Sequence, residues 1–159
     1  MKNYTTHLLN NDVDIITVHM SANFDANAWG LDASKNLAGV TVLTSFNDDQ
    51  CQETYRMDIL TRIEEFANLA VQFKYGYLVC SGEDLENRCL VEMVKKANIK
   101  IICPGIRLEE DEPDDQVRTK TPKEAIELGA DFIILGRCLL QHSENLYKLS
   151  EIITSINSL

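Results

Sequence analysis

Arginine residues follow two short apolar runs in the second half of the chain, and an arginine side chain is well suited to binding an anion. Residues 98–107 read Asn-Ile-Lys-Ile-Ile-Cys-Pro-Gly-Ile-Arg, and residues 130–137 read Ala-Asp-Phe-Ile-Ile-Leu-Gly-Arg. A planar guanidinium can donate two parallel hydrogen bonds to a phosphate or a carboxylate. Arg137 therefore either binds a small anion or forms a structural ion pair with the acidic residues 109–115. Arg107 and Arg118 are expected to be loop anchors or surface charges.

Other polar side chains stand where apolar, β-branched runs end. His19 closes Val-Asp-Ile-Ile-Thr-Val-His, Ser45 closes Gly-Val-Thr-Val-Leu-Thr-Ser, and Ser81 closes Leu-Val-Cys-Ser. We expect His19 to be a structural histidine with its hydrogen bonds satisfied. Ser45 has two readings, because its hydroxyl could contact a ligand or cap the loop that follows. The acidic residues 109–115 indicate a solvated loop rather than a metal site.

Alternating strands and helices must position these side chains. Apolar runs bounded by turn residues predict buried strands, and apolar residues at helical spacing predict helices. The predicted strands are residues 13–19, 37–45, 75–81, 98–103 and 130–135, and the predicted helices are 23–35, 55–73, 84–97, 121–129 and a last helix capped by Ser143. Residues 46–54 are expected to be a polar loop. Such alternation predicts one α/β domain, residues 1–159, with a parallel sheet.

The helix between the two arginine-ended runs has the clearest boundaries in the sequence. Thr121 is a good N-cap, Pro122 suits the first helical position, and Glu124 completes a capping box. Gly129 is placed to end the helix in a left-handed conformation. The unit is therefore strand, long loop, helix and strand, with a right-handed parallel crossover.

Composition excludes several classes of partner. The formal net charge of -10 argues against nucleic acid as the main partner, although a local basic pocket for one phosphate is compatible with it. No apolar run is long enough to span a bilayer, so no membrane association is expected. The five cysteines are scattered and never spaced as C-x-x-C, which indicates free thiols in a reducing compartment such as the cytoplasm.

Taken together, the motifs resemble the C-terminal part of the orotidine 5′-monophosphate decarboxylase family. The similarity lies in Cys-Pro-Gly-Ile-Arg at 103–107, Asp-Gln-Val-Arg at 115–118, Thr-Pro-Lys-Glu-Ala at 121–125 and Gly-Ala-Asp-Phe-Ile-Ile-Leu-Gly-Arg at 129–137. The runs ending at His19, Ser45 and Ser81 are similar to earlier strands of the same family, in the same order. The resemblance implies a (β/α)8 barrel that converts orotidine monophosphate to uridine monophosphate and CO2 without a metal or an organic cofactor.

The resemblance also implies which residues bind a pyrimidine nucleotide. Gln116 and Arg137 match the family's phosphate ligands, and Gly136 supplies backbone beside that phosphate. Ser45 matches a residue that hydrogen-bonds the pyrimidine ring. Pro104 lies where the family packs the pyrimidine base, and its neighbour Gly105 is assigned to substrate binding with it. Barrels commonly bind phosphate in the loops after their last two strands, which agrees with these assignments.

Two departures from the family pattern are plain. The family's catalytic motif Asp-x-Lys-x-x-Asp, which precedes these strands, occurs nowhere in the sequence, so no catalytic residue is assigned. About five strands are predicted, whereas a barrel has eight and typically about 250 residues. The sequence thus predicts an incomplete barrel with exposed sheet edges, covered by a second copy or by a complementing N-terminal chain. The alternative fold is a flavodoxin-like doubly wound sheet, which differs in strand order.

Three functional hypotheses follow from the sequence. The chain is a decarboxylase-like protein that keeps the phosphate end of the nucleotide site and is inactive alone, or an active decarboxylase completed in trans by a chain that carries the missing motif. Otherwise it is a non-catalytic interaction or relic protein that binds no nucleotide. A related barrel decarboxylase acting on a sugar phosphate is a further enzyme alternative.

Overall fold

A computed structural model describes residue 7 and residues 13–25, 34–108, 118–140 and 145–158 of the chain. The strands are β1 (Ile16–His19), β2 (Leu37–Val40), β3 (Tyr77–Val79), β4 (Lys100–Cys103) and β5 (Phe132–Ile133). The α-helices are α2 (Asp48–Tyr55), α3 (Ile59–Gln72), α4 (Arg88–Lys96), α5 (Pro122–Glu127), α6 (Arg137–Leu140) and α7 (Asn145–Asn157). Short 3-10 turns are η1 (Met20–Ala22), η3 (Ser34–Asn36) and η4 (Asp84–Glu86).

Within the described residues, five parallel strands form one open sheet in the order β1-β2-β3-β4-β5. Each strand pairs with the next along the chain, as in the wall of a (β/α)8 barrel. A flavodoxin-like sheet instead reverses direction at its switch point. The flavodoxin-like alternative is therefore wrong, and the prediction of five parallel strands alternating with helices is confirmed.

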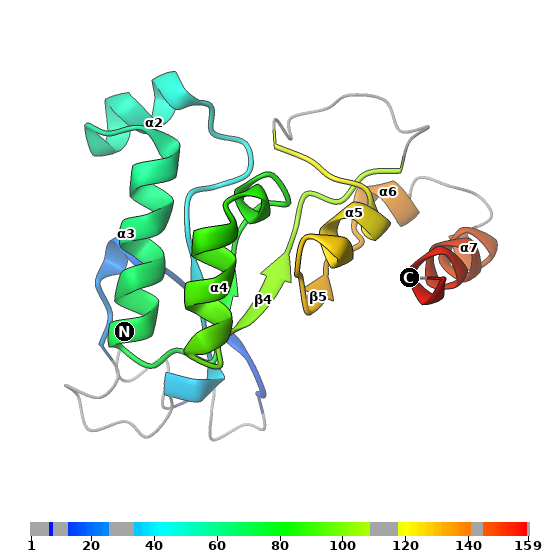
Figure 1. Cartoon of the computed structure of the whole chain (residues 1–159), viewed down its shortest axis with the longest axis horizontal. Coiled ribbons are helices and arrows are strands. Elements are labelled where there is room, and N and C mark those ends of the chain that lie inside the picture. Colours follow the sequence, from blue (N-terminus) through cyan, green and yellow to red (C-terminus); the bar gives the residue numbers. More distant parts are fainter. Residues whose placement is uncertain (1–6, 8–12, 26–33, 109–117, 141–144, 159) are drawn as a thin grey trace.

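The main core lies between the sheet and the helices α3 and α4, which run side by side in Figure 1. The amphipathic helix α3 buries Ile63 and Phe66 against the sheet, and Phe66 is 0% exposed. Burial of a phenylalanine side chain of this kind stabilises a fold by about 1.5–3 kcal/mol. This layer fixes the strands, and with them the loops at their ends.

The opposite face of the sheet carries a smaller apolar cluster. Ala38, Val79 and Ile102 form its centre, with Val40 and Tyr77 packed against it. At the β5 end this face is open, with Phe132 44% exposed and Ile134 49% exposed. The prediction that residues 130–135 form a buried strand is wrong on this face, because no described element covers that side of β5. In a closed barrel this face would be the interior.

The capping box predicted for the helix after the long loop is confirmed. The hydroxyl of Thr121 accepts a hydrogen bond from the backbone N–H of Glu124, whose carboxylate accepts one from the backbone N–H of Thr121. Pro122 is the first residue of α5. Gly129 has a φ of 115°, in the left-handed range expected of a helix end.

Three predicted segments differ from the structure. The predicted polar loop contains α2, because Asn47 forms a capping box with Gln50. The predicted helix 55–73 is interrupted by Arg56, whose φ is 61°, and α3 starts after the N-cap Asp58. Asn23 is left-handed and not helical, while residues 26–33 and Ser143 lie outside the described residues.

Candidate functional site

The loops that could form a site all leave the same edge of the sheet, since parallel strands end on the same side. β1 and β2 end at His19 and Val40, and β3 ends at Val79. β4 ends at Cys103 and β5 at Ile133. Each predicted site residue that the structure describes lies in one of the segments that follow these strands.

Ser45 lies in the connection between β2 and α2 and is half-buried. The backbone N–H of Phe46 donates to the carbonyl of Leu43 at 2.9 Å and closes a turn around it. The cap of the following helix is Asn47, which accepts from the N–H of Gln50 at 2.9 Å. Ser45 is therefore not the residue that caps α2.

Pro104 and Gly105 follow β4, and Gly136 and Arg137 follow the neighbouring strand β5. The two strands are joined where the N–H of Ile134 donates to the carbonyl of Cys103 at 2.9 Å. Gly105 has a φ of 75°, so glycine suits the turn that takes the chain away from the sheet. Two pairs of residues that are far apart in sequence thus leave the sheet beside each other.

Arg137 is exposed and is the first residue of α6. A Cβ atom at Gly136 would have no atom within 4 Å beyond its own residue and its two chain neighbours, so the space beside this backbone is open. The remaining predicted ligand, Gln116, lies outside the described residues.

A buried ion pair that the sequence analysis did not identify connects three of these loops. Arg118 Nη1 lies 2.5 Å from Asp84 Oδ1, and the side chains are 6% and 2% exposed. The expectation that Arg118 anchors a loop is confirmed. In the sequence, Asp84 is only the first residue of the predicted helix 84–97. The partnership was missed because the two residues are 34 positions apart and nothing local links them.

The electrostatics of this edge follow from burial. Burial raises the pKa of Asp84 above its usual value, and the Arg118 guanidinium and the N–H of Ser81 oppose that shift. Burial also raises the pKa of Cys103 to about 12 and that of Cys80 well above its usual value. Both thiols are therefore protonated and poor nucleophiles.

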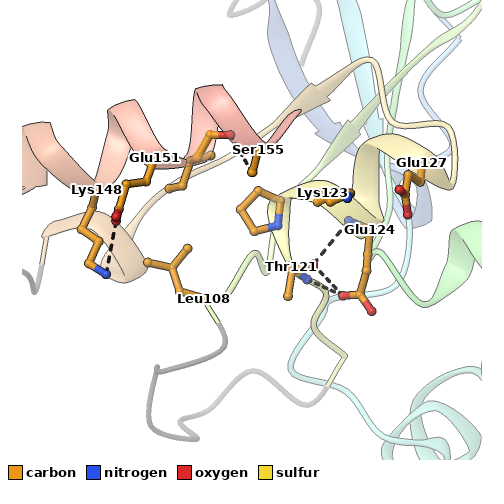
Figure 2. Close-up of a pocket in the computed structure, with 10 residues that line it drawn as sticks. Leu108, Thr121, Lys123, Glu124, Glu127, Lys148, Glu151 and Ser155 are labelled. Carbon is orange, nitrogen blue, oxygen red and sulfur yellow. Dashed lines mark hydrogen bonds and ion pairs between the residues drawn. The ribbon is translucent and has the colours of Figure 1, made fainter. Parts of the chain in front are cut away.

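A groove of about 540 Å³ lies elsewhere, between α5 and α7. Figure 2 shows Thr121, Lys123 and Glu124 on one side and Lys148, Glu151 and Ser155 on the other. Its charges are mixed, and Lys148 lies 3.5 Å from Glu151. None of the five described residues that are predicted to contact substrate lines this groove. We therefore place the candidate site at the sheet edge.

In the described part of the chain, no group of three or more His, Cys, Asp or Glu side chains is arranged to hold a metal ion. None of the described helices is both long enough and apolar enough to cross a membrane.

Comparison with known proteins agrees with this geometry. The sequence profile of the orotidine 5'-phosphate decarboxylase / HUMPS family matches residues 1–152. The chain belongs to this family. It is 32% identical over 151 residues to an orotidine 5'-phosphate decarboxylase of Idiomarina loihiensis, covering 91% of this chain and 64% of that protein. It is 34% identical to the enzyme of the same name from Prochlorococcus marinus, covering 92% of this chain and 64% of that one.

The fold is similar to that of a solved family structure. The crystal structure of orotidine 5'-phosphate decarboxylase from Pyrococcus horikoshii superposes with a TM-score of 0.71 at 17% identity, covering 99% of this chain and 68% of that one. The chain thus spans about 64% of the length of the two family relatives compared by sequence. The open sheet corresponds to part of a barrel wall.

Proposed function

We propose that this chain binds the phosphate end of a pyrimidine nucleotide at an orotidine 5'-phosphate decarboxylase-type site and does not decarboxylate it alone. One observation supports the binding half of the proposal. The adjacent strands β4 and β5 bring Pro104 and Gly105 beside Gly136 and Arg137, at an edge with open space next to the Gly136 backbone. Barrel enzymes commonly bind phosphate in the loops after their last two strands.

The proposed roles follow the family resemblance. Arg137 and Gln116 bind the phosphate, with the Gly136 backbone beside it. Ser45 hydrogen-bonds the pyrimidine ring, and Pro104 and Gly105 pack against the base. We propose no metal and no organic cofactor, and we propose a cytoplasmic location for the chain.

The absence of turnover follows from the chemistry. Decarboxylation of this nucleotide develops a carbanion, which requires a cation held in a pre-organised site. The sequence contains no Asp-x-Lys-x-x-Asp motif. The polar residues at the described strand ends, such as His19 and Ser81, include no lysine to provide that cation.

Titration calorimetry with uridine monophosphate and with uridine tests the proposal, together with a decarboxylation assay on the same sample. We expect binding of the monophosphate, much weaker binding of the nucleoside, and no CO2 release. Equal affinity for both compounds would place the ligand elsewhere, and turnover by the chain alone would refute its inactivity. The absence of any binding would favour a relic protein.

A second candidate is an active enzyme completed in trans, and the exposed apolar residues favour it. Phe132 and Ile134 lie on the open side of β5, and Leu140, Leu146 and Tyr147 are 75%, 79% and 62% exposed. Apolar side chains exposed beside an unpaired strand are typical of a surface that another chain covers. Co-expression with an N-terminal family segment that carries the motif should restore decarboxylation, and Phe132→Glu should prevent it. Self-association in sedimentation would instead indicate that a second copy covers this face.

A further inference from the structure

We infer that Arg118 is a positioning residue that, with Asp84, holds the loop of Ser45 and the loop of Pro104 and Gly105 in one fixed arrangement. This inference rests on the proposed function, because these two loops carry proposed contacts to the base. Arg118 itself is 5% exposed and points into the protein, so it is not offered as a ligand-binding residue.

The first set of contacts fixes the loop after β2. Arg118 Nη2 donates to the carbonyl oxygens of Val42 at 3.0 Å and Leu43 at 2.9 Å. The backbone N–H of Arg118 donates to the carbonyl of Thr44 at 3.3 Å. One residue thus binds the three consecutive carbonyls that immediately precede Ser45.

The second set fixes the loop after β3. Arg118 Nη1 binds Asp84, whose other carboxylate oxygen accepts from the N–H of Ser81 at 2.7 Å. A separate ion pair of 2.6 Å between Lys120 and Glu86 joins the same two segments nearer the surface. The loop after β3 therefore serves as the support on which Arg118 is held.

The third set connects Arg118 to the loop after β4. Ile106 forms an isolated parallel bridge with Lys120, and the N–H of Arg107 donates to the carbonyl of Lys120 at 3.1 Å. The chain just after Pro104 and Gly105 is therefore bound two residues from Arg118. Movement of Arg118 would shift both loops together.

Arginine is needed for this role because its guanidinium donates in several fixed directions at once. Nη1 is directed to a carboxylate while Nη2 is directed to two carbonyls, and a lysine ammonium on a flexible stem does not reproduce that geometry. Arg118→Lys keeps the charge and removes the planar fork. Arg118→Lys therefore distinguishes an effect of hydrogen-bond geometry from an effect of charge.

The test measures amide hydrogen exchange by NMR and uridine monophosphate affinity in wild type, Arg118→Lys and the control Arg88→Lys. Arg88 is an exposed arginine on α4. The reporter amides are Phe46 and Arg107, and the reference amides are Cys80 and Ile134, which bond across the sheet. We expect Arg118→Lys to lose protection at both reporters, keep it at both references and bind the nucleotide about tenfold more weakly.

Each other outcome has a defined meaning. Loss of protection at only one reporter, an equal loss at the reference amides, or an unchanged affinity would overturn the inference, because Arg118 would then be an ordinary stabilising residue. If Arg118→Lys does not fold, Asp84→Asn is measured instead, with the same expectations. If wild type binds no nucleotide, the proposed function fails, and exchange alone decides whether Arg118 couples the two loops.

Discussion

Arg118 and Asp84 form a buried ion pair with 2.5 Å between Nη1 and Oδ1, across three loops at the carboxyl edge of the sheet. Moving two charges out of water is unfavourable, and their attraction and hydrogen bonds offset that cost only when both partners are present. Here Asp84 also accepts from Ser81, and Arg118 also donates to the carbonyls of Val42 and Leu43, although its Nε has no hydrogen-bond partner among the described residues. The pair therefore behaves as a unit.

Removal of one partner should be more damaging than removal of both. Arg118→Met leaves Asp84 buried and unpaired, and we expect it to lower the free energy of unfolding by about 3–5 kcal/mol. The double variant Arg118→Met/Asp84→Leu should recover a large part of that loss. Urea unfolding of the four proteins in this cycle measures it, and additive effects would show that the two side chains are not coupled.

Stability should fall as the solution is acidified through the titration of His19. Its Nδ1 accepts a hydrogen bond from the N–H of Ser21 at 3.2 Å, and a protonated ring nitrogen cannot accept. Burial, followed by the charge of Arg62, lowers the pKa of His19 below 6.5. The unfolded chain therefore binds the proton more tightly, so this contribution is present above pH 6.5 and is lost as the pH falls through the folded-state pKa.

His19→Asn provides the matched variant, because an amide oxygen accepts from Ser21 without titrating. Urea unfolding at about pH 7 and about pH 5 should show a smaller change for this variant than for wild type. Equal changes in the two proteins would assign the pH dependence to other groups.

Arg137→Ala should weaken the binding of uridine monophosphate by roughly 2–3 kcal/mol if the guanidinium forms a charge-assisted pair with the phosphate. Calorimetry measures the change, with Arg88→Ala as the control for a general loss of positive charge. An unchanged affinity in Arg137→Ala would remove this residue from the site.

Two glycine substitutions should differ in their effect on stability. In Gly76→Ala the new Cβ would lie 1.9 Å from the carbonyl oxygen of Lys35, so the backbone must move, at a cost of roughly 1–3 kcal/mol. In Gly136→Ala the new Cβ meets no atom within 4 Å beyond its own residue and its chain neighbours, so stability should change by less than about 0.5 kcal/mol. Gly136→Ala should nevertheless weaken nucleotide binding, and an unchanged affinity would argue against close approach of the phosphate to this backbone.

Much of the fold could be predicted because local signals agree with the global arrangement. Thr121 and Glu124 define the start of α5, and the alternation of strands and helices predicts the parallel sheet. The same reasoning missed α2, although Asn47 and Gln50 carry a capping signal of the same kind. The polar composition of residues 46–54 is typical of a loop and obscures the capping signal.

The candidate site was less predictable, for a physical reason. The positions of Ser45, Pro104 and Arg137 at strand ends can be read from the sequence, because each follows an apolar run. Asp84 and Arg118 are buried because three loops that are far apart in sequence come together. The spacing of apolar residues along the chain does not indicate such contacts. The exposure of Phe132 likewise depends on which element packs beside β5, and the sequence of the strand does not indicate that element.

The strictly consecutive order of the described strands also bears on how the chain folds during synthesis. Every described pairing joins a strand to the one translated just before or just after it. Each new strand therefore finds its partner already outside the ribosome, and no described strand has to wait for a distant segment. We expect the sheet to grow by one strand at a time from β1 toward β5, with the end at which we propose phosphate binding completed last.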